Sequence, residues 1–142
     1  MSISEADLEF VKQHVSAAMI TVGSDGFAKA VRIGVAFVDG KLWSSGTKDR
    51  ARTQRLREDP RCTLFVFDSE FGFVTLETTV TVLDGPDASR MNLRFFREIQ
   101  KKPSGPLSWF GGEYDEDAFV RMMEDEGRVI FELEVQRTYG MH

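Results

Sequence analysis

The sequence has very few of the residues that build disulfides and metal centres. Its 142 residues include one cysteine, Cys62, and two histidines, His14 and His142. A single cysteine cannot form an internal disulfide, and these three side chains are too few for a cysteine- or histidine-based metal site. We therefore expect no metal ligands in this chain.

Long apolar segments are also missing. No run approaches the roughly 18 apolar residues of a membrane span, and the N-terminus lacks the basic and apolar regions of a signal peptide. Only 4 residues are proline, while 42% are hydrophobic and 29% are charged. This composition is typical of globular proteins. The sequence predicts one soluble, cytoplasmic domain over residues 1–142, with no membrane partner.

Carboxylates outnumber cations, 23 to 18, and the net charge is −5. That balance argues against general nucleic-acid binding. One segment is an exception, since residues 48–61 carry more cations than carboxylates. Its cations are Lys48, Arg50, Arg52, Arg55, Arg57 and Arg61. A basic cluster in an acidic protein indicates a particular anionic ligand.

The hydrophobic pattern predicts a chain dominated by strands. Apolar alternation and turn residues predict strands at residues 17–23, 27–38, 41–45, 61–67, 71–83 and 128–137. Helical spacing predicts helices at residues 5–15, 50–58, 88–101 and 115–126. Ser4 and Gly127 are expected to cap the first and last of these helices, and Asp39-Gly40 is expected to form a tight hairpin turn. Residues 101–112 contain two prolines and three glycines and are expected to form a loop. Antiparallel strands interrupted by helices favour a compact barrel, mainly β, with helices at its edges.

The strongest local motif runs from Ser45 to Thr53. It leaves a strand, passes a glycine and enters a helix, where free backbone N–H groups and the helix dipole favour an anion. Arg50 and Arg52 can grip phosphate with two hydrogen bonds each, and the hydroxyls can donate to its oxygens. The candidate phosphate-binding residues are Ser45, Thr47, Lys48, Arg50, Ala51, Arg52 and Thr53. The alternative is a basic helix face that only meets solvent.

The second motif is the small-sided strand at residues 27–38. Alanines and Gly34 would let a flat ring lie close to the backbone, although Gly34 could instead mark a bulge or a barrel corner. Trp109 and Phe110 lie in the glycine-rich loop, where a flexible lid is plausible. No residue pattern indicates acid–base or covalent catalysis, so we assign no catalytic residue and expect chemistry to come from a bound cofactor.

Together these motifs resemble the pyridoxamine-5′-phosphate-oxidase-like superfamily of split β-barrel flavin and deazaflavin oxidoreductases. Residues 50–61 are similar to its phosphate-binding helix and the exit into the next strand. The closing Tyr139-Gly140 pair is similar to the deazaflavin (F420)-dependent branch, FDOR-B. The resemblance implies a six-stranded antiparallel split β-barrel of the FMN-binding type. It also implies a homodimer with two cofactor sites at the subunit interface.

The cofactor implied by this branch is coenzyme F420, whose phosphate and oligoglutamate tail are anionic. By position, the phosphate would be held by Ser45, Arg50, Ala51, Arg52 and Thr53. The deazaflavin ring would lie against the backbone of Val31, Arg32, Ile33 and Gly34. Phe71 matches a position from which relatives place an aromatic residue against the partner's ring. Charge alone suggests Lys29, Lys48 and Arg55 for the acidic tail. Arg52 departs from relatives that carry lysine there, but either cation serves a phosphate.

The resemblance implies an oxidoreductase that uses reduced F420 to transfer a hydride to an electron-poor C=C bond or conjugated carbonyl of a small organic substrate. Three alternatives remain open. The same barrel could use FMN as an oxidase or reductase, or it could bind F420 without catalysis. It could also be a structural barrel that binds no anion.

Overall fold

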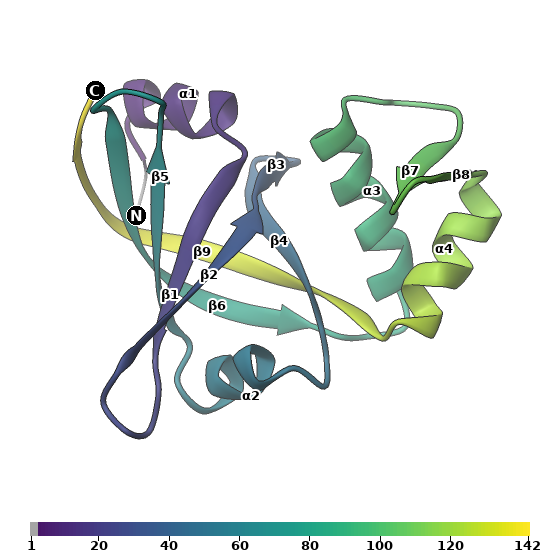
Figure 1. Ribbon diagram of the computed structural model, residues 1–142, viewed down its shortest axis with the longest axis horizontal. Coiled ribbons are helices and arrows are strands. Elements are labelled where there is room, and N and C mark those ends of the chain that lie inside the picture. The colour runs from purple at the N-terminus through teal and green to yellow at the C-terminus, as the bar shows by residue number, and fades with distance from the viewer. Residues whose placement is uncertain (1–2) are drawn as a thin grey trace.

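The computed structural model describes residues 3–142 (Figure 1). The strands are β1 (Ser16–Val22), β2 (Ala28–Gly34), β3 (Ala36–Val38), β4 (Lys41–Thr47), β5 (Arg61–Phe67), β6 (Phe73–Leu83), β7 (Leu107–Trp109), β8 (Gly112–Tyr114) and β9 (Arg128–Met141). The helices are α1 (Glu5–Gln13), α2 (Ala51–Glu58), α3 (Ala88–Gln100) and α4 (Glu116–Asp125). Within the described residues, no helix is both long and apolar enough to cross a membrane.

The main sheet is antiparallel and has seven strands in the order β2-β1-β5-β6-β9-β4-β3. Its two outermost strands, β2 and β3, are consecutive parts of one chain segment separated only by Val35. Hydrogen bonds hold this corner: Val35 N donates to Val15 O (2.7 Å), and Ser44 Oγ donates to Gly34 O (2.8 Å). The sheet therefore curls until its ends meet. This confirms the predicted mainly-β split barrel with peripheral helices.

The corner also explains a difference from the sequence prediction. The expected single strand at residues 27–38 is divided into β2 and β3, because Val35 leaves the ladder and is buried in the core with only 1% of its surface exposed. If β2 and β3 are counted as one bent strand, the barrel has six strands. Gly34 thus marks a barrel corner, which is one of the two interpretations that the sequence left open for this glycine.

The hydrophobic core lies inside the barrel. Strands β1 and β5 alternate between buried and more exposed side chains, as expected when one sheet face points inward. Strand β4 differs because most of its side chains are buried on both faces. Its inner face joins the barrel core, and Trp43 on its outer face packs in a second cluster with Phe95 of α3 and Ile130 of β9. Helix α3 therefore covers the outside of β4 and β9.

Several local predictions are confirmed by backbone geometry. Ser4 caps α1, since its Oγ accepts a hydrogen bond from Asp7 N at 3.2 Å. The predicted hairpin turn at Asp39-Gly40 has φ values of 52° and 77°, as a two-residue turn between antiparallel strands requires. Gly127 ends the α4 region with φ 66°, the left-handed conformation that glycine tolerates.

The prediction of a loop at residues 101–112 is wrong in part, because this segment contains β7 and leads into β8. Phe110 and Gly111 both have positive φ, 44° and 84°, and form a two-residue hairpin turn. Phenylalanine is unfavourable in this conformation, so local propensity does not predict the turn. Strand β9 also runs beyond residue 137 to Met141, because β6 extends far enough to pair Phe73 with Met141.

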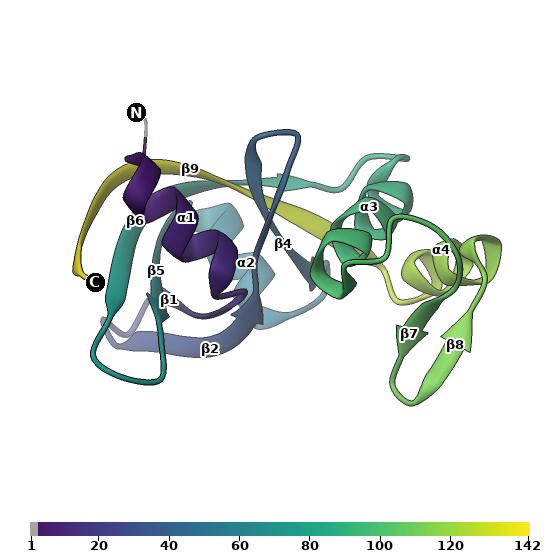
Figure 2. The same cartoon turned by 90° about the horizontal axis from the view of Figure 1, so that it is seen from above.

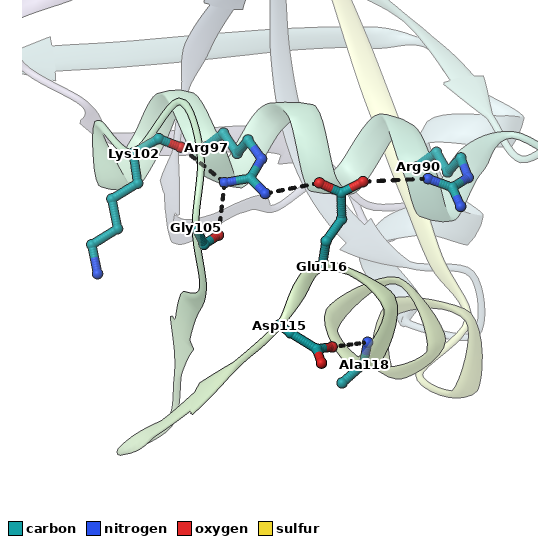
Figure 3. Close-up of polar contacts among 7 residues, drawn as sticks. All are labelled: Arg90, Arg97, Lys102, Gly105, Asp115, Glu116 and Ala118. Atoms are coloured by element: carbon teal, nitrogen blue, oxygen red, sulfur yellow. Dashed lines mark hydrogen bonds and ion pairs between the residues drawn. The ribbon is translucent and has the colours of Figure 1, made fainter.

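The hairpin β7–β8 is anchored to α3 rather than loose (Figure 3). Arg97 of α3 donates to the carbonyls of Lys102 (3.2 Å) and Gly105 (3.1 Å), and to Glu116 at the start of α4 (3.1 Å). Gln100 exchanges two hydrogen bonds with the backbone of Ser108. These contacts do not favour the expectation of a flexible lid.

Candidate functional site

The centre of the candidate site is the connection from β4 into α2, which closes one end of the barrel (Figure 1). Arg50 is the N-cap residue, with extended backbone geometry (φ −73°, ψ 148°), and no side chain caps this helix end. The first turn of α2 contains no acidic residue. The backbone N–H groups of this turn therefore keep their capacity to bind an anion.

Arg52 is the most unusual charge in the site. Its guanidinium lies 5.8 Å above the Phe131 ring, and its Nε is buried without a hydrogen-bond partner in the described part of the chain. Burial lowers the pKa of Arg52, and the positive charge of Arg50 lowers it further. A half-buried cation is unfavourable unless a counter-ion neutralises it. Its surroundings therefore suit a bound anion.

Other arginines of the basic segment are paired within the protein. Arg57 binds Asp84 at 2.8 Å, and Arg61 binds Asp59 at 2.8 Å. The Arg61 pairing holds the pKa of Asp59 at about 2. The interpretation of a solvated, self-paired surface fits these two arginines. It does not fit Arg52, which is half-buried, while Arg50 is exposed; neither has a carboxylate within ion-pair distance among residues 3–142.

The three predicted hydroxyls differ in availability. Ser45 Oγ donates to Asn92 Oδ1 of α3, and the fully buried Thr53 Oγ1 donates to Thr47 O at 2.6 Å. Both protons are engaged within the protein. Thr47 Oγ1, in contrast, is buried without a partner in the part of the chain that is described. Of the three, Thr47 is the hydroxyl that has no protein partner among the described residues.

The remaining predicted cations lie around this centre. Arg55 Nε donates to Thr21 Oγ1 inside the barrel end at 3.0 Å, and Lys48 is exposed beside Gly127, whose carbonyl accepts its backbone N–H at 3.0 Å. Lys29 is paired with Asp25 at 2.9 Å, which makes it the least available of the three proposed tail contacts. Ala51 is exposed at the first position of α2.

The predicted ring-binding segment lies on β2, which pairs only with β1 within residues 3–142. Its other edge keeps backbone N–H and C=O groups free of ladder bonds. Val31 and Ile33 pack against the barrel core, whereas Arg32 points to the outer face. Phe71 lies in the loop between β5 and β6 with 87% of its surface exposed. The segment can therefore offer backbone contacts, and Phe71 is free to contact another molecule.

Sequence reasoning missed the residues that shape the site from distant elements. Phe131 of β9 forms the surface beneath Arg52, Thr21 of β1 orients Arg55, and Asn92 of α3 accepts the Ser45 hydroxyl. No local signal distinguishes them from ordinary core or surface residues. Cys62 lies inside the barrel, where burial raises the pKa of its thiol to about 11, so it stays protonated and is a poor nucleophile. The described residues contain no cluster suited to a metal ion.

The curled antiparallel sheet with a cationic helix start at one end defines a split-barrel protein. Residues 3–142 match the family described as pyridoxamine 5′-phosphate oxidase, and the chain belongs to that family. No curated protein matches the sequence.

Solved structures share the fold at low identity. A conserved hypothetical protein from Mycobacterium tuberculosis is 20% identical with a TM-score of 0.73, over 99% of this chain and 85% of that one. An F420 reductase is 14% identical with a TM-score of 0.71, over 96% and 98%. The heme storage protein HutZ from Vibrio cholerae is 11% identical with a TM-score of 0.66, over 98% and 94%. The fold is therefore shared by proteins described as having different roles.

Proposed function

We propose that this protein is an F420-dependent oxidoreductase. The observation that carries the proposal is the cation site at the start of α2, where Arg52 Nε and Thr47 Oγ1 are buried without partners in the described chain. Two orphaned donors beside a helix N-terminus fit a phosphate group, which accepts several hydrogen bonds. Arg50, at the exposed rim, adds a second guanidinium.

Each part of the site would have a separate task. Arg50, Arg52 and the first N–H groups of α2 would bind the phosphate, and Thr47 would donate a further hydrogen bond. The free edge of β2 at Val31–Gly34 would orient the ring through backbone contacts. Bound in this position, reduced F420 would supply a hydride to an electron-poor C=C bond or conjugated carbonyl, with water supplying the proton.

Charge favours F420 over FMN. Lys48 and Arg55 flank the phosphate site without a carboxylate partner among residues 3–142, and they could bind the acidic tail that FMN lacks. The structure described as an F420 reductase provides a precedent for this cofactor on the same fold. A heme storage protein shares this fold, which makes non-catalytic haem binding a second candidate function. The positions of the two histidines do not favour haem binding. His14 contacts Phe10 O, and His142 contacts Asp7, both on α1.

The deciding experiment is a parallel fluorescence titration of the purified protein with F420 and with FMN. We expect F420 to bind more tightly, and added salt to weaken F420 more than FMN, because more screened charge is involved. Equal or tighter binding of FMN would reassign the cofactor. Tight F420 binding without reduction of any of a panel of conjugated carbonyl acceptors would favour a binding protein over an enzyme.

We also propose that the chain forms a homodimer through the outer face of the sheet. This aromatic face consists of Phe65, Phe67, Phe73, Tyr139 and Met141, with Phe71 in the adjoining loop. The Phe65 ring lies 5.4 Å from Phe67 and 5.3 Å from Phe73. Tyr139 and Met141 are 51% and 62% exposed. A contiguous exposed aromatic surface is typical of an interface.

Replacing Phe71 with aspartate tests this dimer. We expect the variant to shift toward monomers, because a charge would be buried against the partner's aromatic face. Light scattering after gel filtration measures the mass. Phe110→Asp is the matched control, since Phe110 is 91% exposed but lies at the tip of the β7–β8 hairpin, away from β5 and β6 (Figures 1 and 2). An unchanged mass for Phe71→Asp, or an equal shift for both, would contradict the proposed interface.

A further inference from the structure

A pocket lies on the outer face of the sheet, separate from the α2 site. It has a volume of about 360 Å³ and is lined by Ser16, Ala17, Ala18, Arg32 and Phe67. This volume is within the range of small-molecule pockets, roughly 300–1,000 Å³. Small side chains of β1 form its floor. Arg32 of β2 and Phe67 of β5 rise on opposite sides, since β1 lies between these two strands.

The Arg32 side chain brings an unpaired positive charge to this pocket. Arg32 is cross-strand to Ala18, and its only hydrogen bond to the described residues runs from its Nη2 to Ser16 Oγ, at 3.2 Å. Other arginines on the outer face differ: Arg137 binds Glu77 at 3.0 Å, and Arg61 binds Asp59. The guanidinium of Arg32 therefore keeps donors for an anionic ligand.

The aromatic wall completes the pocket chemistry. Phe67 is 52% exposed and presents its ring beside the alanine floor, where a flat molecule could stack on it. A guanidinium binds a carboxylate with two parallel hydrogen bonds, a geometry that lysine cannot reproduce. A flat apolar floor, an aromatic wall and one guanidinium together suit a planar molecule with a carboxylate at its edge.

The position of the pocket relates it to the proposed chemistry. Arg32 belongs to the β2 segment that would orient the cofactor ring, and β2 is the last strand on this side of the sheet. Phe67 also belongs to the aromatic face proposed for the dimer, so in the dimer the pocket would lie at the edge of that interface. Arg32 and the ring segment of β2 lie on the side of the pocket away from Phe67. The resemblance assigns Arg32 backbone contacts only, so a role for its side chain is additional.

We propose that this pocket binds the acceptor substrate, and that the substrate class is a planar aromatic or conjugated carboxylate. Arg32 is the specificity-determining residue, which grips the carboxylate while Phe67 stacks on the ring system. This inference rests on the proposed function for its catalytic meaning. The binding of a carboxylate at Arg32 is independent of the cofactor.

Titration calorimetry of the full chain with 2-naphthoate and with its neutral counterpart 2-naphthamide tests the pocket. We expect the naphthoate to bind at least about tenfold more tightly, as one charge-assisted pair provides. Arg32→Gln should remove that preference and leave 2-naphthamide within about twofold of its original affinity. Arg137→Gln is the matched control, because it removes a paired cation from the same face, and it should preserve the preference.

The possible outcomes separate this inference from the proposed function. Equal binding of the two probes, no binding of 2-naphthoate, or an unchanged preference in Arg32→Gln would overturn the pocket assignment. F420 titration of the same samples tests the cofactor separately. If F420 binds but the naphthoate preference is missing, only this inference fails. If the preference is present and F420 does not bind, the carboxylate pocket stands and the F420 function fails.

Discussion

Arg52→Met should weaken F420 binding by on the order of ten- to a hundredfold without lowering the thermal stability of the cofactor-free protein. A charge-assisted hydrogen bond contributes about 1.5–3 kcal/mol, which accounts for the lost affinity. Stability should stay level or rise, because the half-buried guanidinium has no carboxylate partner among the described residues. Methionine fills similar space above Phe131 without a desolvated charge.

These two effects in opposite directions distinguish a ligand-binding arginine from a structural one. Fluorescence titration measures the affinity, and differential scanning fluorimetry measures the melting temperature. Arg57→Met on the same helix is the control, since Arg57 is paired with Asp84 and its loss should change F420 affinity little. If Arg52→Met keeps its affinity, or melts well below the unmodified protein, the phosphate assignment is wrong.

Gly140→Ala should destabilise the fold by on the order of 3 kcal/mol, as severe overpacking does. A Cβ at this position would overlap the carbonyl oxygen of Phe73 and lie 2.9 Å from the Cα of Val74. Both atoms belong to the backbone of the paired strand β6, so no side-chain rotation relieves the clash. The glycine of the Tyr139-Gly140 pair is thus required by close approach of two strands.

Thermal unfolding measures this effect, with an expected drop in melting temperature of about 10 °C for a domain of this size. Gly85→Ala is the control, because a Cβ there meets no atom within 4 Å, and its melting temperature should change little. A Gly140→Ala variant as stable as Gly85→Ala would show that β6 and β9 separate easily at this end. The ladder between Phe73 and Met141 would then be loosely held.

Local features of the sequence were enough to predict much of the fold. Ser4 before an apolar helical repeat, Asp39-Gly40 between strands and Gly127 after a helix each determine a conformation within a few residues, and the structure has all three. The bend at Val35 and the turn at Phe110 were not predictable in this way. Val35 leaves the ladder because the sheet closes around it, and Phe110 adopts its unfavourable φ where α3 anchors the hairpin.

The sequence by itself determined where cations and small residues gather, because strand ends, helix starts and charge clusters are local properties of the chain. It therefore located Arg50 and Arg52 at a helix N-terminus. Only the tertiary structure decided which arginines are free: Arg57 and Arg61 meet carboxylates, while Arg52 meets Phe131. The physical reason is that pairing and burial depend on contacts between distant segments, which the folded barrel brings together.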